Sequence, residues 1–527
     1  MVDTEKDVPP ETQPPTTGTE PLETKRKLKG VFWFVVIAAV LSSTFLYALD
    51  NTVTANVRPS IVETFGRLDV LTWLSVSYPL GEVGSNPFLY LSALFIFEVG
   101  SAVIGSAQSA AAVIVGRAIA GVGGSGIYVG TVSVISAMTT PAERNQYLGF
   151  IGMTWCLGTI LGPVVGGAFA DSSATWRWAF YINLVIAAVA APACIFLIPH
   201  ISPHVSSSAM QRIKRLDYVG SALFLGGVVS IIMILGFGGA IYVWDSGQLI
   251  GLYVATVVIW LVFCLQQRFS LLTADRIFPA QFVGDWEMVN FFSWTAIAIS
   301  NLVVTVYTLP LFFQFVYGDT SLRAAVFTLP FIGATVVSVG VSAPLFARAP
   351  VYMAWFAGSA AVMLVGAGLL TTIDYHTSRG AIVGFTVIQA LGVGPVIQLA
   401  YTAAQVKVPR ASVPAATAFL TCAQMAGLAL SLGIATSVFL NRATEGISAI
   451  LPGASHELIQ ASIDGARTAL FASLSPELRL RVHQVLADQA ATVFYLNVAG
   501  AALGFVTSFL MKRERLQLDT DGGSSAL

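Results

Sequence analysis

The sequence predicts an all-α integral membrane protein with about fourteen transmembrane helices. Hydrophobic residues make up 55% of the 527 positions and charged residues only 10%, whereas soluble proteins carry about 25% charged residues. A soluble fold of this size could not bury so much apolar surface, so we expect the lipid bilayer to surround the chain. The net charge of −1 argues against nucleic-acid binding.

The two ends of the chain differ from its apolar interior. Residues 1–30 are polar, rich in Pro, Thr and Glu, and end in the basic run Lys25 to Lys29. This composition is typical of a disordered tail and does not fit a cleavable signal peptide. We expect a disordered N-terminal tail over residues 1–30, one polytopic domain over 31–511 and a short C-terminal tail over 512–527.

Apolar stretches close to the length of a spanning helix, about 20 residues, recur throughout residues 31–511. Fourteen can be distinguished, of which the second is short. The expected spans are Val31–Asp50, Val70–Val83, Phe88–Ala107, Ala112–Met138, Tyr147–Ala170, Ala179–Ile198, Tyr218–Phe237, Leu249–Leu265, Met288–Phe315, Ala324–Phe346, Tyr352–Leu370, Ala381–Ala404, Val413–Leu440 and Ala491–Met511.

The distribution of basic residues supports this even count. With a cytoplasmic N-terminus and fourteen crossings, most of the 27 Lys and Arg residues fall on the cytoplasmic side, as the positive-inside rule requires. Both termini are then cytoplasmic. The largest outside segment, about residues 441–490, contains amphipathic patches, and we expect it to form short helices along the outer interface.

The most specific motif lies in the expected fifth helix. It reads Gly158-Thr-Ile-Leu-Gly162-Pro163-Val-Val-Gly166-Gly167. Glycines four residues apart make a flat face for close helix packing, and the proline bends the helix by removing a backbone donor. Packing alone needs only the glycines. The added proline and double glycine resemble the antiporter motif of proton-coupled exporters in the major facilitator superfamily.

Three further motifs extend this resemblance over most of the chain. The sequence is similar to the fourteen-spanner drug:proton antiporters, and especially to fungal secondary-metabolite and toxin efflux pumps. The resemblance implies the major facilitator fold, with two six-helix halves plus two extra helices at about residues 218–265, and proton-coupled export of a small molecule. The matching segments are Leu49-Asp50-Asn-Thr-Val with Pro59, Gly116-Arg117 to Gly124, and Trp176-Arg-Trp to Asn183.

Three charged residues at membrane depth are candidates for proton coupling and translocation. Arg117 must avoid lipid, because an unpaired cation there is costly; it either couples protons or bonds helix-end carbonyls. Asp50 lies about 30 Å from Lys29 along the first helix, so it is either a protonatable group at the cavity mouth or a helix-end carboxylate. Glu98 is either a coupling residue or a protonated or hydrogen-bonded packing residue.

Polar and aromatic side chains within the expected helices are candidates for lining a substrate cavity. Amides are costly in lipid and should point inward, and aromatic rings suit a flat, partly apolar ligand. Packing inside the bundle is the alternative for each of them. The candidates are Trp155, Tyr307, Gln314, Gln389, Gln398, Tyr401 and Gln424.

The sequence shows no pattern typical of an enzyme or a cofactor site. Metal-ligand spacing, a phosphate-binding loop and a nucleophile elbow are absent from it, and the four cysteines have no disulfide or metal spacing. The expected partners are a small-molecule substrate, protons and the bilayer, and we expect a monomer. The expected location is the cell membrane, with a vacuolar or vesicular membrane as the alternative.

One segment departs from the family pattern. The family carries a basic loop between the second and third helices, but here the chain reads Gly81-Glu-Val-Gly84-Ser85-Asn86-Pro87, without Lys or Arg between Arg67 and Arg117. Because this loop is missing, a transport-impaired variant or a membrane sensor stays open as an alternative to an active exporter. A second alternative, on the same fold, is a proton-coupled importer of a solute such as chelated iron.

Overall fold

The computed structural model describes residues 30–65, 90–139, 141–198, 217–239, 242–271, 278–409, 412–454, 456–464 and 474–516. Within these ranges all named elements are helices, and twelve are long and apolar enough to cross a membrane. A thirteenth apolar helix is shorter. The all-α membrane class is confirmed. The expected span Val70–Val83 and the segment Gly81 to Pro87 lie outside the described residues, so the count of fourteen stays a prediction.

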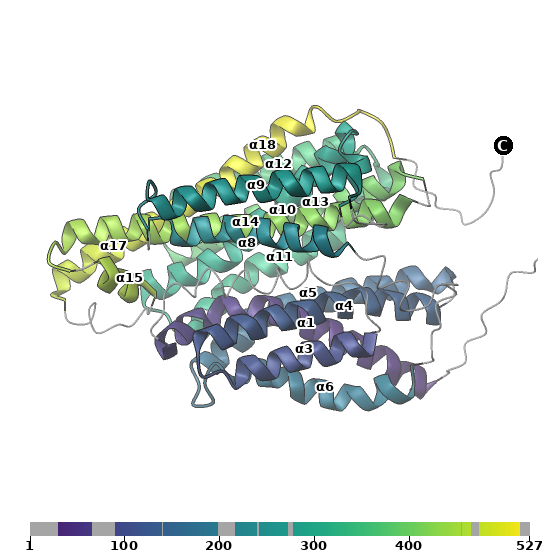
Figure 1. The fold of residues 1–527 in the computed structure, drawn as a ribbon, viewed down its shortest axis with the longest axis horizontal. Coiled ribbons are helices and arrows are strands. Elements are labelled where there is room, and N and C mark those ends of the chain that lie inside the picture. Colours follow the sequence, from purple (N-terminus) through teal and green to yellow (C-terminus); the bar gives the residue numbers. More distant parts are fainter. Residues whose placement is uncertain are drawn as a thin grey trace, which may run out of the picture.

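Two helical bundles make up the protein, and they lie one above the other in Figure 1. The first bundle, coloured purple to blue, contains α1 (Val31–Phe65), α3 (Tyr90–Gly105), α4 (Ala110–Met138), α5 (Pro141–Ala170) and α6 (Trp178–Phe196). The second contains α10 (Trp286–Tyr317), α11 (Ser321–Arg348), α12 (Tyr352–Leu370), α13 (Arg379–Lys407), α14 (Val413–Ile450) and α18 (Tyr495–Ser508). We call them the N-half and the C-half.

The two halves repeat one packing pattern. α1 packs on α5 as α10 packs on α14, and α3 packs on α4 as α12 packs on α13. α6 lies against α1 and α3, just as α18 lies against α10 and α12. This repetition is the internal symmetry expected of two equivalent halves.

Helix starts are fixed by polar side chains that accept hydrogen bonds from first-turn backbone N–H groups. The helix interiors that follow are apolar and satisfy their own backbone groups, as a bilayer requires. These N-caps are Ser109 for α4, Asp217 for α8, Ser246 for α9, Thr320 for α11 and Ser378 for α13.

Two extra helices, α8 (Tyr218–Phe237) and α9 (Gly247–Phe269), lie along the C-half (Figure 1). α8 packs on α14, and α9 packs mainly on α8. Only 17% of the most apolar 18-residue stretch of α9 is buried, so most of the surface of this helix is left for lipid. A short 3-10 turn, η1 (Ala280–Phe282), leads from this pair to α10.

The segment at about residues 441–490 differs from the expectation of short interfacial helices. α14 continues to Ile450, α15 covers His456–Asp464, and α17 covers Pro476–Val493 and leads directly into α18. α17 packs on α14 and α10. The reason is that Val482, Leu486 and Ala490, spaced four residues apart, form a buried stripe. These helices extend the bundle and do not lie flat beside it.

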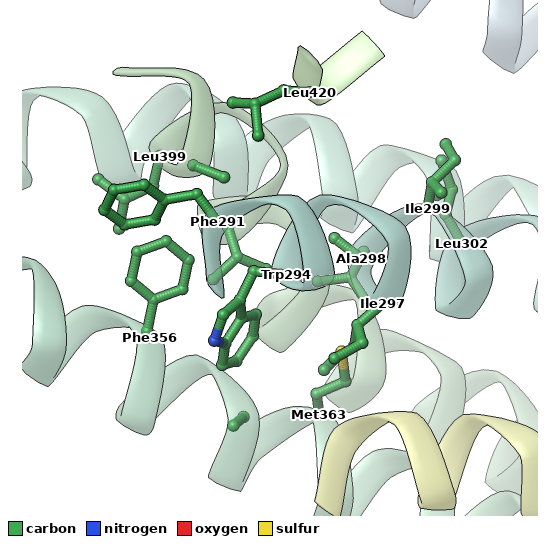
Figure 2. Packing of buried hydrophobic residues seen from close by; sticks show 14 of the residues in the cluster. Phe291, Trp294, Ile297, Ala298, Ile299, Leu302, Phe356, Met363, Leu399 and Leu420 are labelled. Atoms are coloured by element: carbon green, nitrogen blue, oxygen red, sulfur yellow. The ribbon is translucent and has the colours of Figure 1, made fainter. Parts of the chain in front are cut away.

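Each half has its own hydrophobic core. In the C-half, Trp294 lies against Phe356 with ring centroids 4.8 Å apart, and Phe291 packs beside them. Figure 2 shows these rings together with Ile297 and Met363 on facing helices. The separate cores allow each half to behave as a rigid body.

The two halves are in contact where α5 finishes and α11 begins. Gly167 of α5 lies against the first turn of α11, and Asp171 Oδ2 accepts a hydrogen bond from the Leu322 backbone N–H at 3.0 Å. Tyr307 of α10 donates to the backbone oxygen of Asn51 on α1 at 3.3 Å. The structure is therefore closed at the end where α5 finishes and α11 begins.

Candidate functional site

A buried ion pair joins α1 to α4 inside the N-half. Arg117 Nη1 lies 2.7 Å from Asp50 Oδ2 and also donates to the Asp50 backbone oxygen at 3.0 Å. The side chains of Arg117 and Asp50 are 1% and 0% exposed. A buried pair with one partner removed leaves an uncompensated charge, which costs about 3–5 kcal/mol. The two residues therefore form one electrostatic unit.

Two neutral side chains complete this unit. Asn183 of α6 donates from Nδ2 to Asp50 Oδ1 and to Ser101 Oγ of α3, each at 3.1 Å. Asn183 and Ser101 have no exposed surface. The pair and its two neutral neighbours thus connect four of the five described helices of the N-half, namely α1, α3, α4 and α6. We refer to Asp50, Arg117, Asn183 and Ser101 as the N-half network.

The structure decides where Asp50 lies. α1 continues past it to Phe65, so the reading of Asp50 as a helix-end carboxylate is wrong. The estimate of about 30 Å placed it near the outer edge because it took Lys29 as the inner boundary of the membrane. Arg117 faces the bundle interior and bonds a carboxylate as well as a backbone oxygen. Its role in proton coupling stays a prediction.

Glu98 of α3 lies near this network without joining it. It is within electrostatic reach of Asp50, and both of its carboxyl oxygens are buried without a hydrogen-bond partner among the described residues. An ionised carboxylate in such a place is costly, because no donor replaces the lost water. This environment suits a group that is neutral for part of a cycle.

The glycines of the fifth-helix motif fall into two groups. An added Cβ at Gly158 would lie 2.6 Å from the Phe45 backbone oxygen, and one at Gly162 would lie 2.0 Å from Thr52 Oγ1. An added Cβ at Gly166 would lie 2.6 Å from the Val53 backbone oxygen, also on α1. These three glycines, with Pro163 buried among them, let α5 pack closely on α1 within the N-half.

Gly167 belongs to a different interface. A Cβ there would lie 2.8 Å from the Ser321 backbone oxygen and 2.9 Å from Leu322 Cα, both on α11 of the C-half. The double glycine therefore serves two contacts, because neighbouring residues of a helix point about 100° apart. Gly166 faces the partner helix in its own half, and Gly167 faces the other half.

A neutral network occupies the equivalent place in the C-half. Thr305 of α10 donates to Gln389 Oε1 at 2.9 Å and accepts from Asn497 Nδ2 of α18 at 3.0 Å. Gln389 of α13 donates to Asn301 Oδ1 at 3.3 Å. Gln389 is completely buried, which places it inside a helix interface and not on a cavity wall. We call these four residues the C-half network.

The other cavity candidates are dispersed. Tyr307 and Gln314 are buried in α10, and Tyr307 reaches Asn51 across the halves. Gln314 Nε2 has no hydrogen-bond partner among the described residues. Gln398 is exposed and Trp155 is half-buried. Their role as cavity residues stays a prediction.

Sequence reasoning missed two tyrosines of the N-half, Tyr47 and Tyr128, that lie toward the C-half. Tyr401 of α13 donates to Gln424 Oε1 at 2.7 Å and lies within electrostatic reach of Tyr128 on α4. The ring of Tyr128 is 6.1 Å from that of Tyr47 on α1. Tyr401 and Gln424 were candidates from the sequence, but nothing in the chain indicated that Tyr128 lies within electrostatic reach of Tyr401.

The comparisons with known proteins agree with this arrangement. The family model described as Major Facilitator Superfamily matches residues 40–432. The MFS-type transporter pgmG of Aspergillus terreus is 39% identical over 96% of this chain and 92% of its own length. The efflux pump patC of Aspergillus clavatus is 34% identical over 96% of this chain and 95% of its own length. In the described residues, no group of three or more side chains could hold a metal ion.

Solved structures show the same fold at low identity. An inward-facing bacterial homologue of the human lysosomal transporter Spinster superposes with a TM-score of 0.61, covering 93% of this chain and 100% of that protein at 15% identity. A D-xylose–proton symporter gives a TM-score of 0.53, covering 85% and 99% at 14% identity. This multi-pass membrane protein is a transporter of small molecules and not an enzyme, and it belongs to the Major Facilitator Superfamily.

Proposed function

We propose that this transporter is a proton-coupled efflux pump for a small, flat and partly apolar molecule of the fungal secondary-metabolite class. The observation that carries the proposal is the buried Asp50–Arg117 pair, in a chain whose relatives include named efflux pumps. A relative from Leptosphaeria maculans, 37% identical, is named for a phomenoic acid biosynthesis cluster. These names support export of a metabolite.

The N-half network offers a place where one proton changes the packing of several helices. Protonation of Asp50 would remove the charge that holds Arg117 Nη1 at 2.7 Å, while the Asp50 backbone oxygen would still accept from the same nitrogen. Arg117 would then stay attached to α1 with weaker attraction. Because α1, α3, α4 and α6 all contribute to the network, the relative stability of the two transport states would change.

Antiport follows if the proton and the substrate favour opposite states. Glu98 is the second candidate carboxyl, since it lies near Asp50 and lacks a partner among the described residues. A proton passing between Glu98 and Asp50 would neutralise each in turn. The tyrosines Tyr47, Tyr128 and Tyr401 would contact a flat substrate between the halves.

Location and orientation are part of the proposal. The positive-inside rule favours cytoplasmic termini, and export of a metabolite out of the cell favours the plasma membrane over a vacuolar or vesicular one. We further propose that the protein acts as a monomer, since the two halves of one chain already supply the symmetry that alternating access needs. The import alternative has less support, because relatives whose names give a direction are called efflux pumps.

The direction of transport tests the proposal. Full-length protein would be reconstituted in liposomes of known orientation, with rhodamine 6G as a flat aromatic probe and a pH dye to follow protons. We expect rhodamine to leave the cytoplasmic side as protons move the opposite way, at a rate that increases with the pH gradient. Movement of both in the same direction would indicate an importer, and transport without proton movement would contradict coupling.

A further inference from the structure

A pocket of about 610 Å³ lies between α9 and the C-half. Its walls come from α9 and α8 on one side and from α10, α14 and residues 278–284, which contain η1, on the other. The volume falls within the range of about 300–1,000 Å³ that is usual for small-molecule sites. The residues that form it include Trp260, Phe263, Cys264, Phe292, Cys422 and Ala426.

The pocket exists because α9 has little contact with the bundle. α9 packs on α8, and α8 alone of the pair packs on α14. The outer surface of α9 is apolar and exposed, with Val257 58% and Leu261 58% exposed. Cys264, which lines the pocket, is exposed as well, so a membrane would place acyl chains beside both this surface and the pocket. A pocket lined by aromatic rings would not remain empty in that environment.

One cation lines the pocket. Arg268 is in the last turn of α9 and lines the pocket. Its guanidinium lies 5.8 Å from the Phe269 ring centroid, and it has no carboxylate partner among the described residues. It also lies at the end of the bundle where α10 begins, which the positive-inside rule assigns to the cytoplasm. A phosphate group in that leaflet would lie at this depth.

A hydrogen-bonded group of side chains includes the two residues that precede Arg268 in the chain. Asp217, the N-cap of α8, accepts from Gln266 Nε2 at 2.9 Å, from Gln267 Nε2 at 2.6 Å and from the Gly220 backbone N–H at 2.8 Å. These three neutral donors satisfy the Asp217 carboxylate. Among the described residues, no carboxylate is then available to neutralise Arg268, which can attract an anionic group.

We propose that this pocket binds an anionic phospholipid of the cytoplasmic leaflet, with an acyl chain among the aromatic rings and the phosphate at Arg268. The lipid fills the space that separates α9 from α10 and α14 and fixes the extra helix pair to the C-half. Charge complementarity selects the head group, since each basic residue near the surface favours an anionic lipid about fivefold.

Photolabelling of the full chain in liposomes tests this. The probe is phosphatidylserine with a diazirine on one acyl chain, and phosphatidylcholine carrying the same group is the comparison. We expect phosphatidylserine to label α9 and α14 around Cys264 and Cys422 about fivefold more than phosphatidylcholine does. Arg268→Gln should remove this preference. Equal labelling of the wild type by both lipids would overturn the head-group assignment.

Filling the pocket provides the second test. Ala426→Phe should decrease labelling at these positions several-fold, whereas Val257→Phe, on the exposed surface of α9, should not. If Ala426→Phe fails to accumulate in the membrane, Cys264→Trp repeats the test from the opposite wall. Labelling that persists in the filled variant would contradict the proposal. Competition by rhodamine 6G would also overturn it, because the pocket would then be a substrate entrance.

Discussion

The two halves of this transporter place polar networks at equivalent positions but build them from different chemistry. Asp50 and Thr305 lie at the same distance from the starts of α1 and α10, and each is bonded to an asparagine on the last helix of its half. The N-half network contains a carboxylate and a guanidinium, whereas the C-half network contains only amides and a hydroxyl. The symmetry of the two halves therefore determines where the networks lie. Only the N-half network contains charged side chains, so only this network can respond to a proton.

Arg117→Ala should have the largest effect, because it leaves the Asp50 carboxylate buried without its cation. We expect loss of proton-driven efflux and destabilisation of about 3–5 kcal/mol. Efflux from vesicles and thermal unfolding in detergent would measure the two effects. The double variant Arg117→Ala/Asp50→Asn should regain most of the stability but none of the coupling. Coupling retained in the single variant would leave Arg117 a structural role only.

Gly162→Leu and Gly427→Leu compare the close crossing of α5 and α1 in the N-half with that of α14 and α10 in the C-half. A Cβ at Gly162 already lies 2.8 Å from the Leu49 backbone oxygen, beside Asp50, and one at Gly427 of α14 lies 2.8 Å from Ala296 Cα of α10. Overpacking at either site costs about 1–3 kcal/mol. We expect Gly162→Leu to alter the pH dependence of efflux as well, and Gly427→Leu to change only stability. The reverse pattern in the same vesicle assay would contradict our account.

Gln389→Leu tests the neutral network. It removes the partners of Thr305 and Asn301, so we expect a loss of about 1–3 kcal/mol in stability. The pH dependence of efflux should match that of the wild type, because no charge changes. A pH profile displaced by this substitution would show that the C-half also takes part in proton coupling.

Gly167→Ala should have the smallest effect. The new methyl group would meet backbone atoms of Ser321 and Leu322 and weaken the closed end between α5 and α11. We expect a change of a few-fold in the ratio of the two transport states, measured by the distance between spin labels on these helices. Gly152→Ala, on the same helix with no atom within 4 Å of an added Cβ, is the control. Equal distances in both variants would contradict this role.

The sequence was sufficient for the class and for most helix positions, because long apolar runs allow few other structures. It also identified Asp50 and Arg117 as charges that lipid would not accept. It could not pair them, because Asp50, Arg117 and Asn183 lie on three helices and far apart in the chain. Gly166 and Gly167 could not be separated either, since only the assembled halves show which glycine faces α1 and which faces α11.

The central claim is that proton response resides in the charged network of the N-half. The most direct measurement is the ratio of rhodamine 6G efflux rates with and without a one-unit pH gradient, which supplies about 1.4 kcal/mol per proton. Asp50→Asn and Gln389→Leu would be assayed beside the wild type at matched protein levels. We predict that Asp50→Asn transports at the same rate in both conditions, while Gln389→Leu keeps the wild-type ratio. A full gradient response in Asp50→Asn would contradict the account.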